Sequence, residues 1–203
     1  MTRVSGTLRV HEIYLSLRGE STFAGRPCVF VRLTGCDLRC SYCDTACAFN
    51  GGETMTLAAI QNEIAAQAEG YPEPPLVEFT GGEPLARQDA TELSRRIVTD
   101  HQRELVILTN GTLFRGERLD ELAALAGDRL RVQISLDGAS AETNDPIRGD
   151  GSFARITEGI RTAVAAGLRP SVTMVLLQRT LGDVDALVRF AASLGVRNVH
   201  LLW

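Results

Sequence analysis

The sequence predicts an α/β fold in which parallel strands alternate with covering helices. Six short apolar runs punctuate the 203 residues, and each is long enough for one strand. Segments with helical spacing separate these runs, such as Leu57, Ile60 and Ile64, whose side chains fall on one helix face. Strands that are apolar throughout and joined by helices are typical of a parallel sheet covered by helices. Both an open doubly wound sheet and an incomplete barrel fit this pattern.

The predicted elements follow one another regularly along the chain. A proline-rich loop at residues 71–75 leads into the second strand. A later helical segment places Phe153, Ile156 and Ile160 on one face. The predicted strands are residues 29–33, 76–79, 105–108, 132–136, 172–177 and 199–203.

Length and charge are typical of one domain that acts on a small molecule or a peptide. The net charge of -4 provides no cationic field to collect phosphates, which argues against a nucleic-acid partner. No apolar run approaches the roughly 18 residues of a membrane helix, so we expect a cytoplasmic protein with no membrane partner. The sixth strand has no following helix in the sequence. We therefore expect residues 1–203 to be one core domain that lacks its final helix or a C-terminal extension, and a homodimer could cover the strand.

Three cysteines directly follow the first predicted strand. Cys36, Cys40 and Cys43 are spaced by four and three residues. Three thiolates can hold three irons of a four-iron cluster and leave the fourth open to an organic ligand. Four of the five cysteines lie within residues 36–47, which favours a metal site over a disulfide framework. Because Cys47 comes four residues after Cys43, a four-thiolate zinc site or an electron-carrying cluster is an alternative.

Other distinctive residues also follow strands, and α/β folds bind ligands at the carboxyl ends of their strands. Gly81 and Gly82 let the backbone approach a ligand closely, and Glu83 can accept a hydrogen bond from an amino group. Ser135 and Asp137 offer a hydroxyl and a carboxylate suited to a carboxylate group and a ribose diol respectively.

Asn110 and Arg148 have a functional and a structural interpretation each. Asn110 could donate to a cofactor or shape its Asn-Gly turn. Arg148 could pair with a carboxylate in bidentate fashion or be a solvated loop charge.

The cysteine spacing, with the aromatic Tyr42 before the last cysteine and the sequence Gly-Gly-Glu-Pro at residues 81–84, resembles the radical S-adenosylmethionine superfamily. The resemblance implies a radical SAM core, which is a partial (β/α)6 TIM-like barrel. It also implies a [4Fe-4S] cluster that reductively cleaves S-adenosyl-L-methionine to a 5'-deoxyadenosyl radical, with a flavodoxin or ferredoxin as electron donor. The cofactor supplies the radical chemistry, and the protein binds and orients the cofactor.

The resemblance also assigns cofactor contacts. In that superfamily the double-glycine turn holds the methionyl amine, an arginine helps to hold the carboxylate, and the sixth strand meets the adenine with its backbone. The implied cofactor-binding residues are Tyr42, Gly81, Gly82, Glu83, Asn110, Ser135, Asp137, Arg148 and Leu201.

The first 110 residues resemble a narrower family, 7-carboxy-7-deazaguanine synthase, which rearranges a carboxylated tetrahydropterin during queuosine precursor synthesis. The matching stretches are residues 11–14, 17–20, 31–36 and 43–45. The resemblance implies substrate contacts at Leu17, Gly19, Arg32 and Thr80. It also implies Mg²⁺ at Thr45, whose hydroxyl suits a hard cation.

Two departures from the synthase pattern keep a second function open. Arg18 and Ser21 stand where that family has glutamine and glycine. Residues 133–138 and 145–153 resemble instead the peptide-maturing, SPASM-type branch of the superfamily. The two halves therefore indicate different substrates, a pterin or a peptide or cofactor precursor. The maturase interpretation predicts a C-terminal extension that carries cysteines for auxiliary clusters.

Overall fold

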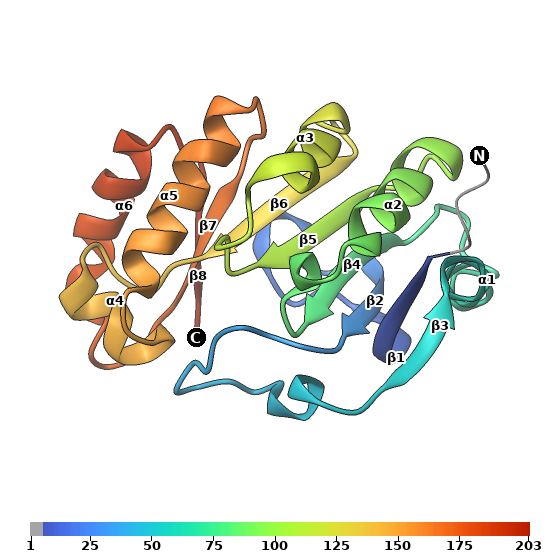
Figure 1. Cartoon of the computed structure of the whole chain (residues 1–203), viewed down its shortest axis with the longest axis horizontal. Helices are drawn as coiled ribbons and strands as arrows, with labels where there is room; N and C mark the ends of the chain where they lie inside the picture. Colours follow the sequence, from blue (N-terminus) through green and yellow to red (C-terminus); the bar gives the residue numbers. More distant parts are fainter. Residues whose placement is uncertain (1–5) are drawn as a thin grey trace.

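The computed structural model describes residues 6–203 as a single eight-stranded sheet with helices along one face (Figure 1). The strand order is β3-β1-β2-β4-β5-β6-β7-β8, so β2 and β4–β8 lie side by side in chain order. A doubly wound sheet instead reverses its order part-way across. With β3 and β8 as its two edges, the sheet is an unclosed, partial barrel, and the predicted fold class is confirmed.

All six predicted apolar runs are strands, and every neighbouring pair among them is parallel. Their chain-order arrangement brings the loops after successive strands to the same end of the sheet. The strands are β2 (Pro27–Leu33), β4 (Leu76–Gly81), β5 (Leu105–Thr109), β6 (Leu130–Ser135), β7 (Ser171–Val175) and β8 (Val199–Leu202).

Two antiparallel strands lie outside the prediction: β1 (Thr7–Leu17) and β3 (Glu53–Thr56). β1 pairs with β2, and β3 extends the sheet beyond β1. At its start β1 buries Leu8 and Val10 and exposes the residues between and before them, the alternation of a strand with one covered face. A pattern based on continuously apolar runs misses such a strand because only every second residue is buried.

Within residues 6–203 there are six α-helices, and most of them lie along one face of the sheet (Figure 1). Leu57, Ile60 and Ile64 are buried on α1, and Ile156 and Ile160 on α5, as their spacing predicts. None of the helices within residues 6–203 is both long enough and apolar enough to span a membrane. The helices are α1 (Leu57–Gln67), α2 (Asp89–Arg95), α3 (Gly116–Ala124), α4 (Ala141–Arg148), α5 (Ser152–Ala165) and α6 (Val184–Ser193).

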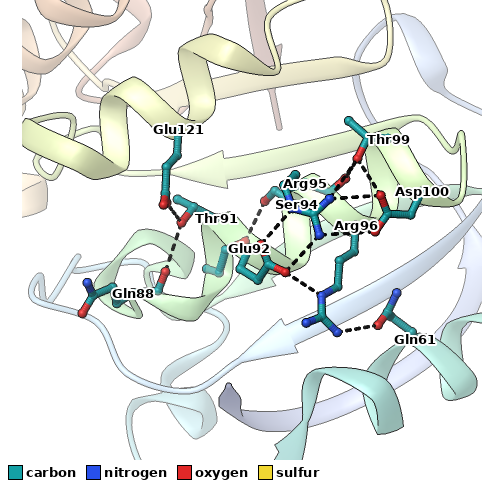
Figure 2. Close-up of polar contacts among 11 residues, drawn as sticks. Gln61, Gln88, Thr91, Glu92, Ser94, Arg95, Arg96, Thr99, Asp100 and Glu121 are labelled. Carbon is teal, nitrogen blue, oxygen red and sulfur yellow. Dashed lines mark hydrogen bonds and ion pairs between the residues drawn. The ribbon is translucent and has the colours of Figure 1, made fainter. Parts of the chain in front are cut away.

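A polar network ties α2 to neighbouring helices (Figure 2). The Glu92 carboxylate pairs with Arg95 at 2.9 Å and with Arg96 at 2.8 Å. Arg96 Nη1 donates to Gln61 Oε1 of α1 at 3.2 Å. These contacts lie on the helix side of the sheet, and so they brace the helical layer.

Alternation along the strands gives the sheet two chemically different faces. Toward the helices, the strands contribute apolar side chains to one continuous core. Toward the other side, β4, β6 and β7 contribute Glu78, Gln133 and Thr173, which are buried polar residues. The core residues include Val31, Phe79, Ile107, Ile134 and Met174, all with side chains fully buried.

Candidate active site

A cavity of about 620 Å³ opens on the polar face of the sheet, at the carboxyl ends of the parallel strands. Its size is in the range of cavities that hold small-molecule ligands. Its wall includes most of the residues that the sequence predicts for the site. These are Gly19, Arg32, Cys36, Cys40, Tyr42, Cys43, Thr45, Thr80, Gly81, Gly82, Glu83, Asn110, Ser135 and Arg148.

Three predicted site residues lie elsewhere. Leu17, at the end of β1, is 65% exposed and is not part of the wall. Leu201 packs its side chain against the hydrophobic core, whereas Leu202, the next residue of β8, lines the cavity. Asp137 is fully buried behind the wall, where it contacts residues that do line the cavity.

The loop after β2 brings three thiols to the cavity. Leu38 N donates to Cys36 Sγ at 3.4 Å, and Arg148 Nη1 lies 3.8 Å from Cys40 Sγ. Burial raises the pKa of the Cys36 thiol to about 11, and it also raises the pKa of Cys40. Metal binding at these thiols must therefore displace protons. N–H groups directed at ligand sulfurs are among the features that tune iron–sulfur clusters.

One side of the cysteine loop is held by Asp37. Asn110 Nδ2 donates to Asp37 Oδ1 at 2.6 Å, and Thr112 Oγ1 donates to Asp37 Oδ2 at 2.9 Å. The Asn110 side chain also accepts from Thr112 N at 2.9 Å. Asn110 thus shapes the turn after β5 and connects that turn to the loop, in line with the structural interpretation of this residue.

The other side of the loop is held by a buried network behind Cys40. Tyr42 Oη donates to Asp137 Oδ2 at 2.7 Å, and Arg148 Nε lies 2.7 Å from the same oxygen. Arg148 Nη2 donates to Tyr42 Oη at 2.5 Å, and Val175 N donates to Asp137 Oδ1 at 2.9 Å. Burial raises the pKa of Tyr42, so its phenol stays protonated as the donor to Asp137. Arg148 is therefore a buried charge with partners and not a solvated one.

The double glycine packs β4 against the cysteine loop. A Cβ atom at Gly82 would lie 2.1 Å from the carbonyl oxygen of Gly35, and Glu83 N donates to that oxygen at 2.6 Å. Gly81 has a positive φ of 95°, and a Cβ there would meet Arg32. A side chain at position 82 would force the loop away from the strand, and one at position 81 would clash with β2.

Glu83 is 1% exposed and both of its carboxylate oxygens accept hydrogen bonds from the protein. Oε1 accepts from Leu85 N at 2.9 Å and from Thr109 Oγ1 at 2.7 Å, and Oε2 accepts from Asn110 N at 2.6 Å. Burial raises its pKa to about 7 despite these bonds. The carboxylate therefore joins the ends of β4 and β5.

The cavity that the thiols line is also lined by Arg32, Thr80 and Gly19. Arg32 Nε pairs with Glu12 at 2.7 Å, and its Nη2 donates to Tyr14 Oη at 3.1 Å. The Tyr14 ring stacks on Phe30 with the ring centroids 5.2 Å apart, and both rings line the cavity. The wall thus combines a fixed guanidinium with a flat aromatic surface.

Arg18 and Glu78 also line the cavity, although the sequence analysis assigned them no role. Arg18 Nη1 lies 2.7 Å from Glu78 Oε2, both side chains are at most 4% exposed, and Arg18 also donates to Gln133. Burial raises the pKa of Glu78 to about 7, although the nearby Arg18 lowers it. A sequence signal existed, because Glu78 and Gln133 interrupt apolar strands and polar residues there rarely stay buried without partners.

The match to a known family decides the class of the protein. A family model described as the Radical SAM superfamily matches residues 30–191. The chain belongs to the radical SAM superfamily. This match confirms the superfamily resemblance that Cys36, Cys40 and Cys43 carry. Enzymes of this superfamily use a [4Fe-4S] cluster and S-adenosylmethionine.

Relatives with different names resemble this chain. A 7-carboxy-7-deazaguanine synthase of Koribacter versatilis is 41% identical over 150 residues, which cover 73% of this chain and 58% of that protein. An AdoMet-dependent heme synthase of Methanosarcina barkeri is 33% identical over 174 residues, which cover 83% of this chain and 48% of that protein. The chain spans about half the length of the curated relatives that it matches.

Solved structures share the fold at low sequence identity. The crystal structure of Streptococcus suis SuiB bound to S-adenosylmethionine superposes with a TM-score of 0.67 and 20% identity, covering 81% of this chain and 37% of SuiB. This likeness supports the partial barrel of the radical SAM core.

The residues at the cysteine loop fit an iron–sulfur cluster. Cys36, Cys40 and Cys43 supply soft sulfur ligands, and two N–H donors already point at their sulfur atoms. Within residues 6–203, no three His, Cys, Asp or Glu side chains converge as they would on a single ion. The three thiolates of a four-iron cluster can lie farther apart, because each thiolate binds a different iron.

Proposed function

We propose that the chain assembles a [4Fe-4S] cluster on Cys36, Cys40 and Cys43, binds S-adenosylmethionine beside it, and acts as a 7-carboxy-7-deazaguanine synthase. The reaction would convert 6-carboxytetrahydropterin to 7-carboxy-7-deazaguanine with loss of ammonia. When bound, the cluster and S-adenosylmethionine supply the radical that starts this rearrangement. Relatives of that name, 36–41% identical in sequence, support the proposal.

One feature of the cavity carries the proposal: the stacked Tyr14 and Phe30 rings adjoin Arg32 in the same space as the thiols. A flat heterocycle with a carboxylate group is complementary to an aromatic surface beside a guanidinium. Glu12 and Tyr14 fix the Arg32 guanidinium before a ligand arrives. Ligand binding therefore loses little side-chain conformational entropy at Arg32.

Mg²⁺ is part of this proposal, with Thr45 as its protein ligand. Thr45 Oγ1 lies 3.3 Å from the Gly81 carbonyl oxygen, and Asp44, the preceding residue, lines the same cavity. Mg²⁺ prefers hard oxygen ligands and keeps several waters, so one hydroxyl, one carboxylate and a substrate carboxylate suffice. The ion would hold the substrate carboxylate near the cysteine loop.

A maturase that acts on a peptide or on another cofactor precursor is the second candidate function. Residues 145–153 favour it, because their sequence resembles the peptide-maturing branch. In the fold, Asn144 and Asp145 anchor α4 to α5 and so hold Arg148 at the cysteine loop. A relative with another name, the AdoMet-dependent heme synthase, covers 83% of the chain and supports this second candidate. S-adenosylmethionine cleavage is common to both candidates, and the substrate separates them.

Turnover of 6-carboxytetrahydropterin tests the proposal. The iron-loaded, reduced chain is expected to form 7-carboxy-7-deazaguanine and ammonia in the presence of S-adenosylmethionine and Mg²⁺. Arg32→Ala is expected to lower kcat/KM roughly 10- to 100-fold, since hydrogen bonds to charged groups contribute about 1.5–3 kcal/mol. Cys40→Ala is expected to abolish cofactor cleavage, whereas Cys47→Ala, a change at an exposed cysteine, leaves it intact.

The outcomes separate the candidates. Cofactor cleavage without any product from the pterin would reject the synthase and favour the maturase. Absence of cleavage by a cluster-loaded, reduced chain would reject both functions.

A further inference from the structure

We propose that Arg148 is a positioning residue for the iron–sulfur cluster: it directs one N–H group at the Cys40 sulfur and thereby raises the reduction potential of the cluster. This inference rests on the proposed cluster at Cys36, Cys40 and Cys43. It differs from a role for Arg148 in holding the carboxylate of S-adenosylmethionine.

The first step is the orientation of the guanidinium. Arg148 Nε pairs with Asp137 at 2.7 Å, and Nη2 donates to Tyr42 Oη at 2.5 Å. One of its nitrogens is therefore hydrogen-bonded to Tyr42, and a second lies in ion-pair contact with Asp137. The third, Nη1, lies 3.8 Å from Cys40 Sγ, so the network aims it at a predicted cluster ligand.

The second step is rigidity. Asp137 is fully buried and accepts hydrogen bonds from Val175 N at 2.9 Å and from Tyr42 Oη at 2.7 Å. The backbone of α4 also contacts the loop, because Ser41 N donates to the Ile147 carbonyl oxygen at 2.8 Å. Since β7, α4 and the loop each contribute to the network, the donor cannot leave the sulfur without breaking several contacts.

The third step is the electrostatic effect. A donor and a positive charge next to a ligand sulfur stabilise the more negative, reduced form of a cluster. With a side chain 6% exposed, Arg148 acts in a medium that screens this interaction weakly. Removing the guanidinium should therefore make the cluster harder to reduce.

The experiment is a redox titration of the iron-loaded protein without S-adenosylmethionine, followed by electron paramagnetic resonance of the reduced cluster. Arg148→Met is expected to shift the midpoint to a more negative potential, so that the reduced fraction at one fixed potential falls several-fold. Tyr42→Phe, which removes one anchor of the guanidinium and keeps the ring, is expected to shift it less in the same direction. Arg148→Lys is expected to shift the midpoint less than Arg148→Met does, because lysine keeps the positive charge but lacks the planar guanidinium with its fixed N–H directions.

Arg39→Met is the matched control. Arg39 lies in the same loop but donates to the carbonyl oxygens of Cys36 and Leu38, not to a sulfur. The cluster of Arg39→Met is expected to have the same midpoint potential as the cluster of the parent protein.

The possible results are distinct. Unchanged potentials in Arg148→Met and Tyr42→Phe at full iron content would overturn the inference, and so would a shift of equal size in Arg39→Met. Weaker S-adenosylmethionine binding with an unchanged potential would also overturn it, in favour of a carboxylate contact. If Arg148→Met does not load iron, the midpoint potentials of Tyr42→Phe and Arg148→Lys test the inference in its place. Failure of the parent protein to bind a cluster would instead reject the proposed function.

Discussion

Backbone contact between Gly82 and Gly35 sets how closely the double-glycine turn after β4 approaches the thiols. The carbon atom of the Gly35 carbonyl would lie 2.6 Å from a Cβ at position 82, and this neighbour is backbone that cannot rotate away. The residue type at one position thus controls the placement of a whole loop.

Gly82→Ala is expected to destabilise the chain by about 1–3 kcal/mol, the usual cost of overpacking, and to reduce iron loading strongly. Urea unfolding and iron analysis measure these two effects. Gly182→Ala is the matched control, because among the described residues nothing lies within 4 Å of a Cβ at that position. A stable Gly82→Ala variant with full iron content would contradict this account.

At the same scale, several functional side chains are engaged by partners that no local motif reveals. Asp37 contacts Asn110 from 73 positions away, and Arg18 contacts Gln133 from 115 positions away. Asn110 could be predicted because it follows a strand. Asp37 and Arg18 could not, because their partners come near only in the folded chain, and Glu78 was marked only by its place inside an apolar strand.

At the scale of elements, the helical layer and the cavity rim are separately braced. The network around Glu92 connects α2 with α1 through Arg96 (Figure 2), whereas the cysteine loop is held from β5, β6 and α4. Hydrogen bonding to Arg95, more than any other effect, lowers the pKa of Glu92 to about 2. Glu92 therefore stabilises the fold above its ordinary pKa of 4.5, and this contribution is lost as the pH falls toward 2.

Glu92→Gln is expected to lower the free energy of unfolding by less than about 1 kcal/mol at neutral pH, because solvent screens these partly exposed pairs. The difference between parent and variant should shrink as the pH falls below 4.5. Urea unfolding at several pH values measures it, and iron loading serves as the control. A loss of several kcal/mol, or a change in iron loading, would show that the helical layer and the rim are coupled.

The element scale also explains which strands could be predicted. The six parallel strands are mostly apolar, and all but β8 are largely buried, so they read as apolar runs. By contrast, β1 alternates and β3 is polar and mostly exposed, so neither forms a continuous apolar run in the sequence.

At the scale of the whole molecule, the barrel encloses carboxylates that resist ionisation. Burial raises the pKa of both Glu78 and Glu83 to about 7. Between pH 4.5 and about 7 the folded chain keeps these protons while the unfolded chain has released them. The stability that they contribute is therefore fully present below pH 4.5 and is lost as the pH rises through about 7.

The free energy of unfolding of the iron-free chain is thus expected to fall as the pH rises from 5 to 8, by about 1.4 kcal/mol for each unit of pKa shift that is realised. Glu78→Gln should make this slope shallower, even though the variant is less stable because Arg18 loses its partner. Glu104→Gln, which breaks a half-exposed pair with Arg26, should leave the slope as it is. Equal slopes in all three proteins would refute the assignment to Glu78.

The sequence by itself determined the alternation of strand and helix, the order of the site residues along the chain and the spacing of the three thiols. These features are local, because hydrophobic periodicity and motif spacing act over a few residues. The tertiary structure decided the unclosed chain-order sheet, the cavity with Arg18 and Glu78 in its wall, and the network that directs Arg148 at Cys40. Such features depend on partners up to 115 positions apart, and only the pairing order of the strands brings them within hydrogen-bonding distance.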